Sequence, residues 1–496
     1  MQADKIKNYI LIVVLALISF AIYANSLRGD FLIDDAGGIL YNARIHDLKA
    51  YFSGDFHIAP GFLWQLVNIF NWQVSGLNPF YYHLFNVLVN TLCVVLLFIL
   101  CNILFKNRRL SFFSSLIFAI HPLHSEAVSW ISAGHYPFSS LFFISSMIFY
   151  CLADRSILNF ILSLAFYALG IFAGNATVVL PLMFIAYELF FKEVSVGNKP
   201  SRNFRILTIS LMFVLSFIFM AAVFIARENY LHYVFSKSGP AYLIAATKQI
   251  VYYLKILYMP VERGLYHPFG YATVGLQKIS PAFFGSLLVI FIAIFLFFRC
   301  RRKDPALSFG IAWFFICYLP YSNIIPVCNI IAERYMYLAS AGYSIIMAYV
   351  ILKIWESINT RIRGRHIFRA FAVIAITLFL SSYCLLTLKN NEDFSNVVTF
   401  WETNINNFPQ GCRAYNSLAG RFYALGNLDQ AIAYCRVNLL IKPDQPQVWS
   451  NLAKAYRAKG DFKQAAECYK KALEIKKDYA PAQRGLEEIL SLTRKQ

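Results

Sequence analysis

The sequence has few charged residues for its length. Of its 496 residues, 14% are Asp, Glu, Lys or Arg, whereas 58% are hydrophobic and 17% are aromatic. An ordinary soluble protein carries about 25% charged residues. The low charge content therefore excludes a conventional soluble protein and indicates a polytopic membrane protein. The length allows two or more domains.

The sequence also shows no metal-binding or disulfide pattern among its cysteines and no small-residue cleavage site after its first apolar run. Its ten Cys are scattered, mostly within apolar stretches, with no CxxC pair and no Cys/His spacing. This arrangement gives no support for a zinc site or a disulfide framework. Lys5 and Lys7 precede the first apolar run, and no small-residue cleavage site follows it. We therefore expect an uncleaved membrane anchor.

The formal net charge of +19 does not indicate nucleic acid binding, because the basic residues cluster in short loops between apolar stretches. Such loops lie on the cytoplasmic side of a membrane. A helix needs about 20 apolar residues to cross a bilayer, which predicts about eleven spans here. They lie near residues 8–27, 80–104, 110–126, 137–153, 156–173, 176–191, 205–226, 281–299, 306–321, 330–353 and 366–388.

With a cytoplasmic N-terminus, these spans leave residues 28–79, 121–136, 227–280 and 322–329 on the outer side. The segment 241–259 is long enough to cross, but Lys248 and Lys255 interrupt it. A crossing there would also move the basic loop near residue 300 to the outer side, against the positive-inside rule. We therefore interpret 241–259 as a re-entrant or interfacial helix.

The composition changes past residue 390, where one pattern occurs twice. Seven positions recur at an offset of about 34 residues, the period of the tetratricopeptide repeat, which is a pair of antiparallel helices. Tyr415, Leu418, Ala419, Phe422, Gly426, Leu428 and Ala431 align with Trp449, Leu452, Ala453, Tyr456, Gly460, Phe462 and Ala465. The sequence therefore predicts an all-α chain: a membrane domain over 1–390 and a tetratricopeptide-repeat α-solenoid over 391–496. The solenoid comprises a half repeat at 391–411, repeats at 412–445 and 446–479, and a capping helix at 480–492.

Two adjacent carboxylates, Asp34 and Asp35, follow the first predicted span within the segment 31–42. Close like charges and partial desolvation by apolar neighbours raise the pKa of at least one of them. A carboxylate in that setting can accept a proton from an alcohol or help to hold a cation. A solvated turn is the alternative interpretation, since Asp and Gly are common turn residues.

A second polar cluster, His121, His124 and Glu126, lies at the end of the third predicted span. His121 and His124 are three residues apart, so they can face the same side of a helix or turn. Ionisable groups at membrane depth usually line a polar cavity. A helix end whose imidazoles meet the lipid headgroups is the alternative.

Basic side chains occur on the same predicted side. Arg334 stands at the outer start of the tenth span, and its planar guanidinium suits a phosphate, although the adjacent Glu333 could be a structural partner. Lys255 and Arg263 stand near the re-entrant segment. The predicted topology thus collects carboxylates, imidazoles and cations on one side of the membrane.

Together these motifs resemble the membrane O-mannosyltransferases that carry tetratricopeptide repeats, and their bacterial relatives. These proteins form part of the C-type superfamily of polyprenyl-phosphate-sugar glycosyltransferases. The resemblance covers essentially the whole chain and is carried, in order, by FLIDDAGGILYN (31–42), GLNPFYYHLFNVLVN (76–90), HPLHSEAVSWISAG (121–134), VLPLMFIAYELFF (179–191), YLKILYMP (253–260) and NIIPVCNIIAERYMYLASAGY (323–343).

The resemblance implies transfer of mannose or a related hexose, with inversion, from a polyprenyl phosphate to a hydroxyl of a protein or glycan acceptor. One of Asp34 and Asp35 would be the general base, with the other supporting it. The cavity would be lined by His121, His124 and Glu126, and the donor phosphate would be bound by Arg334 or, as weaker candidates, Lys255 or Arg263. No metal or other cofactor is expected, and the partners are membrane lipids rather than nucleic acid. The repeats would lie outside a bacterial inner membrane, or in the endoplasmic reticulum, and would hold the acceptor.

Three positions depart from the family pattern. Ala59-Pro60 stands where Arg-Pro is common, Gly134-His135 where Gly-Arg is usual, and Gly174-Asn175 where Lys-Glu is usual. These lost charges keep a second interpretation open, namely a catalytically silent membrane scaffold whose repeats bind a protein partner. A transporter is disfavoured because the spans show no internal inverted repeat.

Overall fold

The structure is a computed structural model. It describes all residues except 1, 53–60, 154–155, 192–200, 227–240, 261–280, 325–326, 328, 330, 362–364 and 494–496. Within the described part of the chain the regular elements are helices, without a strand, so the predicted all-α fold class is confirmed. The chain divides into a membrane unit that extends to Ser395 and a repeat unit that begins at Asn396.

Six of the described helices are long and apolar enough to cross a membrane. They are α1 (Gln2–Tyr23), α6 (Pro79–Phe105), α12 (Ser201–Ala226), α15 (Pro281–Cys300), α17 (Ser340–Arg361) and α18 (Arg365–Glu392). Shorter apolar stretches include α10 (Ile157–Ala173), α11 (Leu180–Phe191) and α16 (Pro305–Tyr318). The chain is therefore an integral membrane protein, and the count of about eleven spans remains a prediction.

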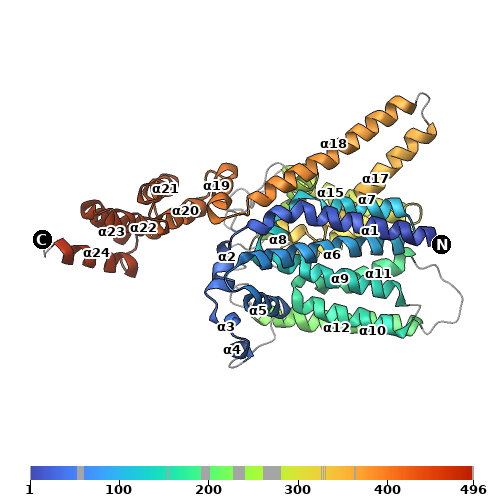
Figure 1. The fold of residues 1–496 in the computed structure, drawn as a ribbon, viewed down its shortest axis with the longest axis horizontal. Helices are drawn as coiled ribbons and strands as arrows, with labels where there is room; N and C mark the ends of the chain where they lie inside the picture. Colours follow the sequence, from blue (N-terminus) through green and yellow to red (C-terminus); the bar gives the residue numbers. More distant parts are fainter. Residues whose placement is uncertain are drawn as a thin grey trace. The chain divides into compact units, whose positions relative to one another are not determined.

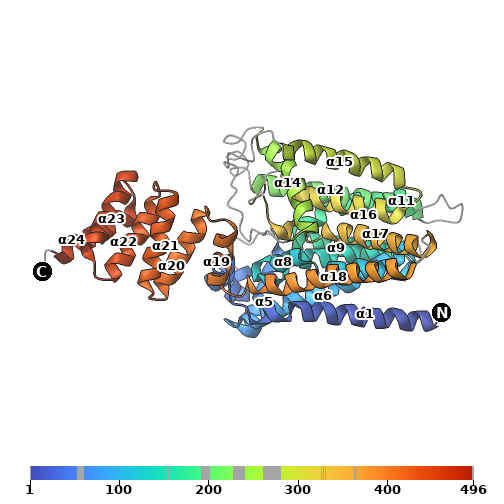
Figure 2. The ribbon, with the colours of Figure 1, turned by 90° about the horizontal axis from the view of Figure 1, so that it is seen from above.

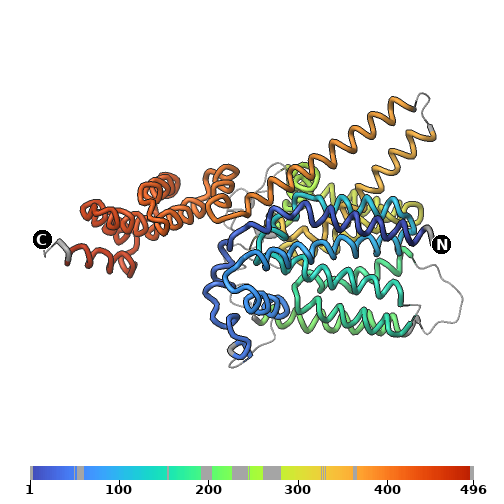
Figure 3. Tube along the Cα trace, viewed as in Figure 1, coloured from blue at the N-terminus to red at the C-terminus, as the bar shows by residue number. Residues whose placement is uncertain are grey.

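Helix α6 is the centre of the bundle. It packs against α1, α7 (Arg108–Ala119) and α9 (His135–Cys151), while α17 packs on α7 and α16. Figures 1 and 3 show α1 and α6 running side by side, and Figure 2 shows the same bundle from above. By contrast, α12, α15 and α18 expose large apolar side chains, including Phe217, Phe291 and Phe371. Such exposure is compatible with lipid, because acyl chains are as apolar as these side chains.

Local sequence signals set the ends of α6. Asn78 caps its start by accepting a hydrogen bond from the Phe80 amide (3.1 Å), and Pro79 occupies the first helical position, where a missing N–H costs nothing. Lys106 ends the helix with a φ of 51°, and the Asn107 side chain then caps α7. This tight turn makes α6 and α7 antiparallel neighbours.

Short helices cluster at the end of the bundle opposite the N-terminus (Figure 1). The segment after α1 forms α2 (Ile33–Asp35), η2 (Ala36–Leu40), α3 (Ala43–His46), α4 (Leu48–Phe52) and α5 (Phe62–Ser75). The segment after α7 forms η3 (Pro122–His124), α8 (Ser125–Ser129) and η4 (Ile131–Gly134), and η8 (Glu333–Met336) precedes α17. Contacts join α2 to η4 and η8 to α8, so segments far apart in sequence meet here.

The segment predicted at 241–259 forms the helix α14 (Ala241–Tyr258), which packs on α15. The hydroxyl of Tyr253 donates to the Ala332 carbonyl (3.3 Å) and accepts from the Ala332 amide (3.2 Å). Helix α14 thereby fixes the backbone that leads into η8. Its re-entrant or interfacial placement remains a prediction.

The repeat unit consists of antiparallel helix pairs that stack in chain order (Figure 2). They are α19 (Val397–Asn407), α20 (Cys412–Ala424), α21 (Leu428–Ile441), α22 (Pro446–Ala458), α23 (Phe462–Ile475) and α24 (Ala480–Thr493). Gly426 and Gly460 turn from the first to the second helix of each repeat with φ of 78° and 87°, which glycine adopts without strain. Buried Ala419, Ala453 and Ala465 allow close helix packing in the core.

Candidate functional site

A polar cavity of about 280 Å³ opens where η4, η6 (Asn175–Val179), η7 (Leu319–Tyr321) and η8 approach one another. Its wall carries a carboxylate, a guanidinium, an imidazole, two amides and several aromatic rings. The lining residues are Asp34, Trp130, Ser132, Ala133, His135, Tyr136, Asn175, Tyr321, Val327, Asn329, Arg334 and Tyr335. Asp34 and Arg334 are separated by 300 positions in the sequence, yet both line this cavity.

The two adjacent aspartates have different environments. Asp34 is exposed and lines the cavity, whereas Asp35 is fully buried. Asp35 accepts hydrogen bonds from the Leu32 amide (2.7 Å), from the Ser132 amide (2.8 Å) and from the Ser132 hydroxyl. Asp35 therefore ties α2 to η4, and it is Asp34 that can reach a molecule in the cavity.

Burial raises the pKa of Asp35 from 3.8 to about 6, although its hydrogen-bond donors favour the ionised form. The folded state then binds the proton more tightly than the unfolded chain, so the free energy of unfolding falls as the pH rises from about 4 to about 6. A pKa change of this size corresponds to about 3 kcal/mol. We expect the melting temperature of the wild type to fall relative to Asp35→Asn between pH 4 and pH 7.

Differential scanning fluorimetry of the two proteins in detergent measures this difference. Asp47→Asn is the matched control, because it removes an exposed carboxylate from the same segment. Melting curves of the wild type and Asp35→Asn that shift in parallel with pH would contradict the expected titration of Asp35.

The η4 segment is positioned by Asn86 on α6. The Asn86 side-chain amide lies 3.3 Å from the carbonyl oxygens of Val128, Trp130 and Ile131 and donates to this group of acceptors. Gly134 is needed at the end of η4, because a Cβ there would lie 2.1 Å from the Asn86 side-chain oxygen. This close approach of loop and helix orients Ser132 and His135.

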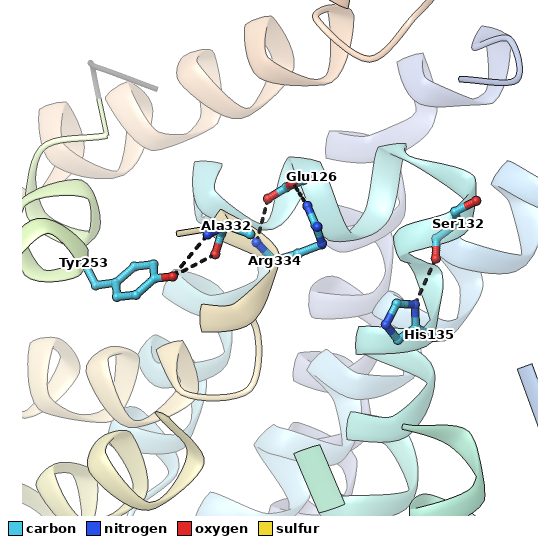
Figure 4. Close-up of polar contacts among 6 residues, drawn as sticks. All are labelled: Glu126, Ser132, His135, Tyr253, Ala332 and Arg334. Carbon is cyan, nitrogen blue, oxygen red and sulfur yellow. Dashed lines mark hydrogen bonds and ion pairs between the residues drawn. The ribbon is translucent and has the colours of Figure 1, made fainter. Parts of the chain in front are cut away.

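Arg334 is held by Glu126, a residue from α8. The Arg334 amide donates to Glu126 Oε2 (2.8 Å), and the Arg334 guanidinium forms an ion pair with Glu126 Oε1 (Figure 4). The guanidinium also lies over the rings of Trp130 and Tyr335, at 5.3 and 5.4 Å from the ring centroids. A guanidinium has five N–H donors, so donors remain for an anion in the cavity.

His121 and His124 lie in the packed interior and are not among the side chains that line the cavity. His121 Nε2 donates to the Leu257 carbonyl (3.2 Å), and its Nδ1 accepts from the Leu123 amide (3.2 Å). His124 Nε2 forms a hydrogen bond with the Ser340 hydroxyl (2.7 Å). These imidazoles connect α14 and α17 to η3, and Glu126 reaches the site through Arg334.

Neither of the other two predicted cations is among the described residues that line the cavity. Lys255 is exposed on α14 and is absent from the lining. Arg263 lies outside the described residues, as does Ala59. Sequence reasoning did not propose His135 and Asn175 as site residues, although both line the cavity. The sequence signal that could have identified these two residues is that both positions depart from the family pattern.

An apolar groove of about 470 Å³ adjoins the cavity, because Asn175 and Val327 line both. Helix α12 contributes nearly half of its lining residues, namely Phe213, Ser216, Phe217, Phe219, Met220, Val223 and Phe224. The remaining lining residues come from η6, α11, η7 and the adjoining segments. A long apolar chain in this groove could place a polar end group in the cavity.

The fold and the site thus define a helical membrane protein with a polar cavity beside an apolar groove, followed by tetratricopeptide repeats. The tetratricopeptide repeat family matches residues 446–479.

The chain is 23% identical over 514 residues to the human protein O-mannosyl-transferase TMTC3, covering 94% of this chain and 55% of the relative. The human protein O-mannosyl-transferase TMTC1 is 22% identical and covers 89% of this chain and 56% of the relative. The chain is therefore homologous to the protein O-mannosyl-transferases over most of its length, and it spans about half the length of these curated relatives.

Two solved structures share a partial likeness to the chain. The Archaeoglobus fulgidus oligosaccharyltransferase in the apo form has a TM-score of 0.45 at 14% identity, covering 82% of this chain and 59% of that chain. ArnT from Cupriavidus metallidurans, bound to undecaprenyl phosphate, has a TM-score of 0.40 at 13% identity, covering 92% of this chain and 79% of that chain.

Proposed function

We propose that the chain is an inverting membrane glycosyltransferase that moves mannose or a related hexose from a polyprenyl phosphate to a hydroxyl of a protein or glycan. The observation that carries this proposal is the arrangement of Asp34 and Arg334 on one cavity beside an apolar groove. A carboxylate and a guanidinium in one small cavity supply the two charges that such a transfer needs. Homology to protein O-mannosyl-transferases supports the same reaction class.

In the proposed reaction, the acceptor oxygen attacks the anomeric carbon from the face opposite the phosphate. The acceptor O–H loses its proton to the Asp34 carboxylate as the new C–O bond forms. The bond between the anomeric carbon and the phosphate oxygen breaks, and polyprenyl phosphate leaves with the electron pair. Arg334, fixed by Glu126, stabilises the negative charge that develops on the leaving phosphate. No metal is required in this scheme, because the guanidinium carries the electrostatic role.

The apolar groove fits the other part of the donor. Its aromatic and aliphatic side chains suit the isoprenoid chain, and its shared border at Asn175 and Val327 would bring the phosphate toward Arg334. Lys255 and Arg263 remain weaker candidates for the phosphate. His121 and His124 would act from the interior by holding η3.

The acceptor and the cellular location form part of the same proposal. The repeats would hold a protein or glycan acceptor on the extracytoplasmic side, in a bacterial inner membrane or in the endoplasmic reticulum. A repeat groove suits this role, because stacked repeats create extended binding surfaces.

The test is donor consumption by the purified full chain in lipid nanodiscs. With polyprenyl-phosphate mannose radiolabelled in the sugar, we expect release of polyprenyl phosphate and transfer of label to extracytoplasmic acceptor proteins, with a rate unchanged by EDTA. Asp30→Asn is a matched control, because it alters an exposed carboxylate outside the cavity lining. A protein that neither binds nor consumes the donor, yet still captures a protein through its repeats, would support the silent scaffold instead.

A further inference from the structure

His135 has a defined orientation in the wall of the cavity. It is half-buried at the start of α9, and its Nδ1 lies 2.9 Å from the Ser132 carbonyl oxygen (Figure 4). A carbonyl oxygen can only accept, so Nδ1 must carry the hydrogen. In the neutral ring Nε2 is then a hydrogen-bond acceptor. Among the described residues, no second hydrogen bond from this ring is found.

The same Ser132 that holds His135 also holds the aspartate segment. Its amide and hydroxyl donate to Asp35, and its carbonyl accepts from His135. The imidazole is further packed by the rings of Tyr136 and Trp64, at centroid distances of 4.1 and 6.2 Å. His135 is therefore fixed relative to the segment that carries Asp34.

The side chains that line the cavity include few that only accept hydrogen bonds. The Asn, Ser and Tyr side chains can both donate and accept, and Arg334 and Trp130 only donate. The acceptor-only groups are the Asp34 carboxylate and, in its fixed tautomer, Nε2 of His135. The positive charge of Arg334 in the same wall disfavours a second positive charge on the imidazole.

We infer that His135 is a specificity-determining residue whose Nε2 accepts a hydrogen bond from one hydroxyl of the donor sugar. This inference rests on the proposed function, in which Asp34 is engaged by the acceptor hydroxyl. A hexose brings several O–H donors into a small cavity, and each needs an acceptor there. The neighbouring rings of Trp130, Tyr136 and Tyr335 give the sugar faces against which to pack.

The experiment compares polyprenyl-phosphate mannose with its 2-, 3-, 4- and 6-deoxy derivatives, using the full chain in nanodiscs. For the wild type, we expect kcat/KM to be about three- to tenfold lower for one deoxy donor than for mannose, the size of one lost neutral hydrogen bond. His135→Phe should abolish this difference by lowering only the value for mannose and for donors that keep the hydroxyl. His135→Gln, whose amide oxygen can accept, should restore part of the difference. His366→Phe is the matched control, since His366 is exposed at the start of α18 and should leave the discrimination unchanged.

Two results would overturn the inference, and they are distinguishable. If His135→Phe lowers kcat/KM by the same factor for every donor, His135 has a structural role only, and the proposed function stands. If the wild type neither binds nor consumes any of these donors, the proposed function fails and the inference fails with it.

Discussion

Asp34→Asn should lower the rate of sugar transfer by at least about 100-fold while leaving the protein folded, since general base catalysis typically contributes about 10² to 10⁴-fold. The reason is that Asn cannot accept the proton of the acceptor hydroxyl. Asp34 is exposed to the cavity and is not buried in the fold, so its replacement should change the melting temperature little. The measurement is single-turnover transfer from labelled polyprenyl-phosphate mannose, with the melting temperature recorded for the same samples.

Replacement of the neighbouring Asp35 provides a sharper test of the role proposed for Asp34. Asp35→Asn should mainly alter stability, because the buried carboxylate accepts three hydrogen bonds that link α2 to η4. An amide at this position presents an N–H group where two carboxylate oxygens now accept, so one donor must lose its partner. If instead Asp35→Asn lost transfer at an unchanged melting temperature and Asp34→Asn were active, the two roles proposed here would be reversed.

The separate roles of these aspartates could not be predicted from the sequence. Adjacent residues have the same composition around them, and burial depends on a partner that lies far away in the chain, here Ser132. The all-helical fold, the repeat pattern and the clustering of polar segments could be predicted from the sequence, because apolar run length and repeat period are local properties. The pairing of residues that are distant in the sequence, such as Asp35 and Ser132, is not a local property.

The histidines illustrate the same limit. Spacing correctly indicated that His121 and His124 lie close together, with ring centroids 5.7 Å apart. It could not indicate whether they face a cavity or the interior, since this depends on α14 and α17, which supply Leu257 and Ser340. At His135 the sequence shows only a departure from the family pattern. The structure places this residue in the cavity wall, where it can affect specificity. The sequence alone does not show that position.

Arg334→Met should raise the KM for the donor by about 10- to 100-fold, the size of lost hydrogen bonds to a charged phosphate. It should also destabilise the protein, because the buried Glu126 carboxylate would lose its guanidinium counter-ion and keep the hydrogen bond from the backbone amide of residue 334. Removing one member of a buried ion pair costs about 3–5 kcal/mol. The side chain of Glu126 is only 1% exposed and that of Arg334 is 13% exposed, so the carboxylate cannot turn to solvent. The measurements are the KM for polyprenyl-phosphate mannose and the melting temperature.

The double variant Glu126→Gln/Arg334→Met separates the two effects. It removes both charges, so it should recover much of the stability that Arg334→Met loses, because no buried charge is left alone. It should not recover donor affinity, because the guanidinium that faces the cavity is still absent. Arg334→Lys should be intermediate, since it keeps the charge but lacks the planar fork that binds phosphate oxygens in pairs. If the double variant regained both stability and wild-type KM, Arg334 would only be the structural partner of Glu126, and the donor phosphate would have to be bound by another cation. A role of the guanidinium in transfer therefore requires that the double substitution restores stability without restoring the affinity for the donor.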